Sequence, residues 1–106
     1  MWKQKTSASW EGRIYMAGDI EQAKQKIREL AYNKGMCVTV TKTDYIYTAG
    51  EQSGFIVGLI QYPRFEILEC ELESRLCVLA EALAERCCQK SFTVCFPKHS
   101  IYFQRD

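Results

Sequence analysis

The sequence predicts an α+β domain in which two βαββ units form a mainly antiparallel sheet with two helices packed on one face. The first observation is a faint internal repeat, because an offset of 56 residues sets Ile20 against Leu76 and Val38 against Val94. At this offset, apolar residues with helical spacing in the first half align with apolar residues of the same spacing in the second half, and alternating strand-like segments align in the same way. The composition of 47% apolar and 25% charged residues is typical of a globular domain.

The chain begins with a polar segment. We expect residues 1–12 to form a loosely ordered N-terminal arm and residues 13–106 to form a single α+β domain. The arm is rich in Lys, Gln, Thr and Ser and carries two tryptophans. The first strand candidate is Arg13–Met16, and the turn-forming pair Gly18 and Asp19 ends it.

A first amphipathic helix is predicted from Ile20 onward. Asp19 and Gln22 have the spacing of a capping box, in which polar side chains satisfy free N–H groups. Apolar residues then recur at helical spacing on one face, with charged residues on the other. The helix is expected to end at Lys34 and Gly35, because a cation suits the last turn and glycine suits the left-handed position after it.

The next segment is predicted to contain a short hairpin and a central strand. Cys37–Thr41 and Tyr45–Thr48 both alternate, and the turn-forming residues 42–44 separate them. Gly50–Gly54 is expected to be a flexible loop. The apolar run Phe55–Tyr62 then indicates a strand covered on both faces, which the following proline ends.

A second helix is predicted over residues 65–89, where leucines recur three and four positions apart. A closing hairpin follows, with strands Ser91–Phe96 and Ser100–Phe103 around the turn Pro97–His99. Both helices pack on one face of the sheet in the most economical arrangement of these elements.

The other face of the predicted sheet has no helix over it, and it is where we expect a partner to bind. Strand alternation puts Thr39, Tyr45 and Tyr47 or their neighbours on this face, depending on the register. The same face, or the edge strand of either hairpin, is available for pairing with a second copy, so a homodimer is left open.

The six cysteines and the one histidine form no recognisable site. Cys95 and His99 lie four residues apart, but a strand cysteine between apolar neighbours is typical of packing rather than of nucleophilic catalysis. The vicinal pair Cys87 and Cys88 has no second pair at zinc-ligand spacing. We therefore predict that the protein is not an enzyme, that its cysteines are reduced, and that it needs no metal and no cofactor.

The charges and the hydropathy argue against two kinds of partner. A formal net charge of +1 disfavours direct nucleic-acid binding, which needs several uncompensated cations. No apolar run approaches the roughly 20 residues needed to span a bilayer, so no membrane partner is expected. Glu69, Glu73 and Glu81 belong to an acidic surface on the second helix, which either is solvated or steers the protein towards a basic partner.

One segment resembles a known class of proteins. Residues 45–50, Tyr-Ile-Tyr-Thr-Ala-Gly, together with residues 54–65, Gly-Phe-Ile-Val-Gly-Leu-Ile-Gln-Tyr-Pro-Arg-Phe, are similar to a segment in small accessory proteins of phages and prophages. The resemblance implies a short, single-domain, cytoplasmic protein that binds and blocks a host factor, as anti-CRISPR proteins do. It implies no functional residues.

These observations lead to the hypothesis of a non-catalytic protein-binding module, a phage-encoded inhibitor of a CRISPR-type host defence protein. Its expected partner is a host protein of a nucleic-acid-binding defence complex in the host cytoplasm. Aromatic anchors and steering carboxylates are the expected contacts. They are Tyr45, Tyr47, Arg64, Glu69, Glu73 and Glu81.

Three alternatives remain. The first is a small-ligand binding domain of the nucleotide type that uses Gly50–Gly54 and Arg64. The second is an enzyme that uses Cys95 and His99. An RNA-binding module with stacking tyrosines is disfavoured, because the start of the second helix is acidic at Glu66 and Glu69 where a double-stranded-RNA-binding domain carries lysines.

Overall fold

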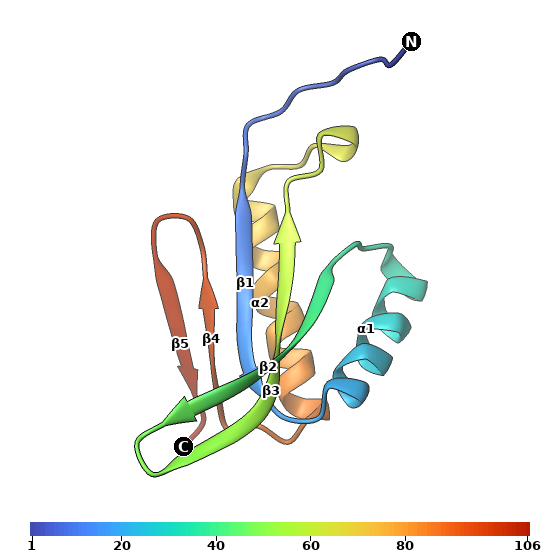
Figure 1. The fold of residues 1–106 in the computed structure, drawn as a ribbon. Coiled ribbons are helices and arrows are strands. Elements are labelled where there is room, and N and C mark those ends of the chain that lie inside the picture. Colours follow the sequence, from blue (N-terminus) through green and yellow to red (C-terminus); the bar gives the residue numbers. More distant parts are fainter.

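The computed structural model describes residues 1–106 and contains five strands, two α-helices and one short 3₁₀ turn. Residues 1–9 have no regular secondary structure and extend beyond the end of β1 (Figure 1), and the Lys5 side chain donates to the Arg64 carbonyl at 3.5 Å. The elements in chain order are β1 (Glu11–Ala17), α1 (Ile20–Lys34), β2 (Thr39–Tyr47), β3 (Gly50–Ile60), the 3₁₀ turn Pro63–Phe65, α2 (Glu69–Arg86), β4 (Ser91–Cys95) and β5 (Ser100–Gln104).

The strands form one sheet in the order β2-β3-β1-β4-β5, and every neighbouring pair is antiparallel. Both helices lie on the same side of this sheet, with α2 behind β1 in Figure 1. The predicted α+β class, with an antiparallel sheet and two helices on one face, is therefore confirmed.

The side of the sheet that faces the helices holds the hydrophobic core. Ile14 on β1 pairs in register with Val57 on β3 and Val94 on β4, and all three side chains are fully buried. Leu76 and Leu83 of α2 cover this row and are also fully buried. Helical spacing on α2 and alternation on the strands thus bring their apolar positions to one interface.

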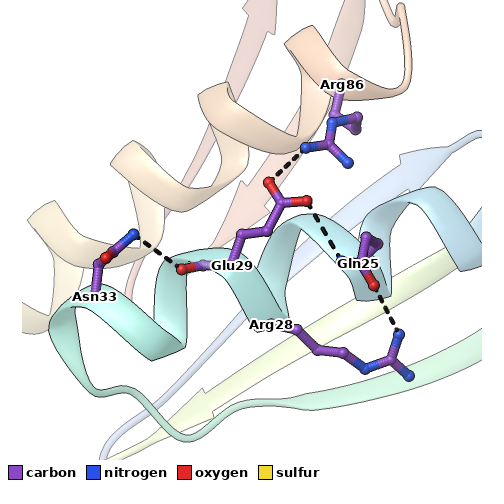
Figure 2. A network of polar contacts seen from close by, with 5 residues as sticks. All are labelled: Gln25, Arg28, Glu29, Asn33 and Arg86. Atoms are coloured by element: carbon purple, nitrogen blue, oxygen red, sulfur yellow. Dashed lines mark hydrogen bonds and ion pairs between the residues drawn. The ribbon is translucent and has the colours of Figure 1, made fainter.

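The two helices are also linked by polar side chains at their surface. Arg86 at the end of α2 donates to the Glu29 carboxylate of α1 at 2.6 Å, and Gln25 donates to the same carboxylate at 3.5 Å (Figure 2). This hydrogen bond from Arg86 is the main reason why the pKa of Glu29 is lowered. Neither helix has the length and apolar character needed to cross a lipid bilayer.

Helix α1 has the predicted ends. The Asp19 carboxylate accepts a hydrogen bond from the Glu21 backbone N–H at 2.9 Å, so it caps the first turn. Gly35 follows Lys34 with a φ of 56°, and its N–H donates to the Ala31 carbonyl. A residue with a side chain is strained in this left-handed conformation, which explains the glycine.

The predicted turn at residues 42–44 is wrong, because β2 continues through it from Thr39 to Tyr47. Lys42 and Asp44 pair with residues of β3 instead of reversing the chain. The segment Gly50–Gly54 is likewise the start of β3 rather than a flexible loop. The real turn is Thr48–Ala49, where Ala49 has a φ of 68°. One long hairpin makes more backbone hydrogen bonds than the two short strands that we expected.

The two helix–hairpin segments have the same element order but different places in the sheet. In the first hairpin the strand that follows the helix, β2, lies at the edge, whereas in the second the strand that follows the helix, β4, lies beside β1. The sheet has five strands because the segments expected as two separate strands form β2 alone. The repeat therefore describes the order of elements and not a spatial symmetry.

The connection between β3 and α2 is held by a buried glutamine. Gln61 is only 8% exposed, and its side chain donates to the Ile67 carbonyl at 2.6 Å and accepts from the Ile67 N–H at 3.1 Å. These two bonds fix an extended segment before α2, which begins at Glu69 rather than at the predicted residue 65. Pro63 starts a 3₁₀ turn in place of the first helical turn.

Candidate functional site

The face of the sheet that points away from the helices is polar and aromatic, and we call it the open face. One row across it pairs Tyr15 on β1 with Thr93 on β4, and Thr93 with Tyr102 on β5. The predicted alternation puts Thr39, Tyr45 and Tyr47 of β2 on the same face, which the register confirms. The side chain of Tyr102 is 61% exposed.

A hollow of about 500 Å³ lies at one end of the open face, and we call it the open-face depression. This volume falls within the range of roughly 300–1,000 Å³ that is usual for small-molecule sites. In Figure 1 the β2–β3 hairpin curves across the sheet toward the end of β5, and it forms one wall. The lining residues are Tyr15, Met16, Ala17, Tyr45, Gln52, Cys88, Gln89, Lys90, Ser91, Phe92, Thr93 and Tyr102.

Tyr45 is fixed in the wall of the depression. Its hydroxyl donates to the Phe55 carbonyl at 2.9 Å. Its ring lies over Gly54, where an added Cβ would come within 2.6 Å of the ring and would also clash with the Met16 carbonyl oxygen. Gly54 therefore lets β1 and the Tyr45 ring approach closely. Burial is the main cause that raises the pKa of Tyr45, so this hydroxyl stays protonated and remains a donor.

The opposite rim is formed by the end of α2. The Cys88 N–H donates to the Glu85 carbonyl and the Gln89 N–H donates to the Ala84 carbonyl, which is the hydrogen-bond pattern of a Schellman motif. Cys88 occupies the left-handed position with a φ of 55°. This reversal directs the chain from α2 into β4 and brings residues 88–90 to the depression.

The depression contains hydroxyl, amide and ammonium groups but no acid. Its lining includes no Asp, Glu or His, and Lys90 is its one charged side chain. Five of the polar side chains, those of Tyr15, Tyr45, Ser91, Thr93 and Tyr102, carry hydroxyl groups. The site is therefore suited to a ligand that presents a flat ring and an anionic group, because tyrosines stack on rings and lysine pairs with anions.

The structure brings only one of the six predicted contact residues into this depression, namely Tyr45. Tyr47 lies at the tip of the hairpin, 54% exposed, with its ring against Gly50. Arg64 lies at the other end of β3, in the 3₁₀ turn, with its guanidinium 5.0 Å from the centre of the Phe65 ring. The tyrosines and the arginine do not form one surface.

The three predicted carboxylates lie on α2, on the other side of the sheet. Glu73 lies 3.8 Å from the imidazole of His99, measured from Oε1 to Nε2. Glu69 and Glu81 are exposed and form no ion pair. Other carboxylates of this helix are paired with arginines, as Glu71 is with Arg75 at 2.8 Å. The acidic surface is therefore weaker than the sequence indicates.

The alternative sites from the sequence are also separated. Gly50–Gly54 and Arg64 lie at opposite ends of β3, so they do not form one ligand site, although Gln52 lines the depression. Cys95 pairs with residues of the open face, whereas His99 contacts Glu73 on the helix side. No group of three or more His, Cys, Asp or Glu side chains is placed to hold a metal ion.

The sequence interpretation missed most of the lining residues. Tyr15 and Tyr102 occupy outward positions of alternating strands, so the strand pattern contained a signal for them. Lys90 and Cys88 carried no such signal, because their place depends on the left-handed reversal after α2. Only the pairing of β1, β4 and β5 brings these residues together.

The fold and the depression define a small α+β protein with a ligand-sized hollow on a sheet face. No protein-family model and no curated protein sequence matches the chain. Two solved structures match its fold. A phage SAM lyase in the apo state aligns with a TM-score of 0.74 at 12% identity, over 100% of this chain and 98% of its own. A phage SAM lyase in complex with S-methyl-5′-thioadenosine aligns with a TM-score of 0.63 at 12% identity, over 98% and 95%.

These matches correct the hypothesis of function. Both matched proteins are phage proteins, which agrees with the predicted resemblance at a general level. The interpretation as a non-catalytic, anti-CRISPR-like inhibitor is wrong, because both are described as lyases of a small molecule and neither as an inhibitor of a host protein. The alternative of a nucleotide-type ligand agrees better, although its site is not the one we expected from Gly50–Gly54 and Arg64.

Proposed function

We propose that this protein binds S-adenosylmethionine (SAM) in the open-face depression and cleaves it to S-methyl-5′-thioadenosine. The observation that carries the proposal is the fold match over the whole chain to a phage SAM lyase, at a TM-score of 0.74. A depression of about 500 Å³, lined by tyrosines and one lysine, supports it independently.

The chemistry of SAM defines the bond that breaks. S-methyl-5′-thioadenosine keeps the sulfur, the methyl group and the adenosyl group, so the bond from sulfur to the aminocarboxypropyl chain is cleaved. The electron pair of this bond goes to the sulfonium sulfur, which becomes a neutral thioether. An oxygen of the substrate's own carboxylate forms the new bond to the same carbon, and a lactone closes.

The lining residues suit this reaction. Internal displacement by the substrate carboxylate needs no water, no proton transfer and no protein base, and the depression has no Asp, Glu or His to act as one. The faces of Tyr15, Tyr45 and Tyr102 suit the adenine ring and the sulfonium cation, through stacking and cation–π attraction. The contribution of the protein is to hold the chain of SAM in a folded, reactive conformation.

The test is incubation of the purified protein with SAM and detection of products by mass spectrometry. We expect S-methyl-5′-thioadenosine and a lactone in equal amounts. When the reaction is run in heavy water, the freshly formed lactone should carry no deuterium on its carbon atoms. An unsaturated amino acid in place of the lactone would show an elimination that needs a base. Unchanged SAM would contradict the proposed function.

A matched pair of tyrosine variants locates the reaction. Tyr102→Ala removes an exposed ring from the depression, and Tyr32→Ala removes an exposed ring from α1 on the other side of the molecule. We expect Tyr102→Ala to weaken SAM affinity by about tenfold, because stacking of a base on an aromatic ring contributes roughly 1–3 kcal/mol. Tyr32→Ala should leave it unchanged.

A further inference from the structure

The charge of the open-face depression is unusual for this chain. Lys90 is its one charged lining residue, although the chain carries 14 basic and 13 acidic residues. Lys90 forms no ion pair with any carboxylate of the protein. Lys90 also borders a second hollow that Glu81 and Glu85 line, but it forms an ion pair with neither. Its ammonium group is therefore free to pair with an anionic group of a ligand.

The backbone of Lys90 is held in place from two sides. On one side the Schellman motif fixes Cys88 and Gln89, and the Gln89 side chain donates to the Cys87 carbonyl at 3.0 Å. On the other side the Arg105 N–H donates to the Lys90 carbonyl at 2.8 Å. The stem of the lysine thus starts from a defined point on the rim, beside the tyrosines of the sheet.

We propose that Lys90 recognises the carboxylate of the ligand and so distinguishes the substrate from the nucleoside product. The inference rests on the proposed function. SAM carries one carboxylate, on the aminocarboxypropyl chain, and S-methyl-5′-thioadenosine carries none. The tyrosine-lined part of the depression contacts the adenosyl group, which both molecules share, and Lys90 contacts the part that only the substrate has.

This division has a consequence for turnover. Before cleavage the ligand is held by the rings and by the Lys90 ammonium, which binds one carboxylate oxygen and leaves the other free to attack. When the lactone closes, the carboxylate loses its charge and the contact with Lys90 weakens. The nucleoside then keeps only the stacking contacts, so it dissociates more readily than the substrate.

The test measures the binding of two unreactive probes to the full-length protein by calorimetry. S-adenosylhomocysteine carries the carboxylate, and S-methyl-5′-thioadenosine lacks it. The variant Lys90→Met removes the cation and keeps a similar length, and Lys98→Met is the matched control in the β4–β5 turn outside the depression. Lys90→Arg keeps the charge.

We expect Lys90→Met to lower the affinity for S-adenosylhomocysteine by roughly tenfold and to leave the affinity for S-methyl-5′-thioadenosine within about twofold of the wild-type value. Lys90→Arg and Lys98→Met should bind both probes like the wild type. Equal weakening of both probes by Lys90→Met would show a merely structural role, and no weakening of either would show no role. Each of these results would overturn the inference.

Adenosine monophosphate distinguishes a carboxylate site from a phosphate site. If the wild type binds it more tightly than S-adenosylhomocysteine, and Lys90→Met abolishes that preference, the group recognised is a phosphate and the inference is wrong. Failure of the proposed function is a separate result. If Lys90→Met selectively weakens S-adenosylhomocysteine binding but the wild type leaves SAM intact, the inference about Lys90 is retained and the proposed cleavage is refuted. If the wild type cleaves SAM but Lys90→Met binds both probes with unchanged affinity, the cleavage is retained and the inference about Lys90 is refuted.

Discussion

The two faces of the sheet are built from alternate residues of the same strands, yet they serve different purposes. On β1, Ile14 is fully buried under α2, while its neighbour Tyr15 lines the open-face depression. The covered face consists of apolar side chains packed against leucines, and the open face consists of hydroxyl groups and rings that contact solvent. The comparison teaches that stability and ligand binding are separated in this fold by a single step along a strand.

The largest expected effect compares these two neighbours directly. Ile14→Ala should lower the free energy of unfolding by about 2–5 kcal/mol, because it leaves a cavity under α2. Tyr15→Phe removes only a hydroxyl group from the open face and should change the free energy of unfolding by about 0.5 kcal/mol or less. Urea unfolding followed by circular dichroism measures both. Similar losses in the two variants would show that the faces are not separate.

The next effect concerns the place where the open face meets β1. Gly54→Ala should lower the free energy of unfolding by about 1–3 kcal/mol, because the new methyl group meets the Met16 carbonyl oxygen and the Tyr45 ring. Ser53→Ala is the control, since its side chain is exposed at the adjacent position. A Gly54→Ala protein as stable as the control would mean that β1 and the hairpin are less close than described.

A smaller effect of opposite sign is expected at the rim of the depression. Cys88→Gly should raise the free energy of unfolding by about 1 kcal/mol, because glycine relieves the left-handed strain at a φ of 55°. The same substitution at Cys70, inside the first turn of α2, should lower it by about 0.5 kcal/mol. If Cys88→Gly also destabilised, the thiol itself would contribute to the packing of the rim.

The smallest effect concerns the helix layer over the covered face. Glu29→Gln should lower the melting temperature at neutral pH, because it weakens the bond from Arg86. The pKa of Glu29 is lowered in the folded state, so its stabilisation is complete above the ordinary glutamate value of 4.5 and is lost as the pH falls through the folded-state pKa.

Melting curves from pH 7 to pH 3 measure this effect, with Glu66→Gln as a control that breaks no ion pair. We expect the Glu29→Gln protein and the wild type to converge at the acidic end. A difference that persists there would mean that the carboxylate acts through its shape rather than through its charge.

Much of the covered face could be predicted from the sequence, because its signals are local. Asp19 and Gly35 mark the ends of α1 through capping rules that depend on a few neighbouring residues. The leucine spacing of α2 and the alternation of β4 likewise identified the buried positions. Each of these patterns follows from the geometry of one element.

The open face could be predicted only in part, because its features depend on contacts between distant elements. Residues 42–44 have the composition of a turn, but pairing with β3 overrides that preference and extends β2 through them. Lys90 enters the depression only because α2 reverses at Cys88, a residue type that rarely adopts the left-handed conformation. Neither outcome can be read from neighbouring residues alone.

The β2–β3 hairpin extends past the end of β1, since the pairing with β1 stops at Gly54 while β2 and β3 remain paired to Tyr47 and Gly50. The last part of the hairpin is therefore a two-stranded ribbon, and such a ribbon has low stability by itself. Its amide hydrogens should exchange with solvent through local fraying, at a free-energy cost below that of global unfolding. The tip of this wall of the depression is consequently more mobile than the floor, whereas Tyr45 stays anchored to the Phe55 carbonyl and the core stays intact.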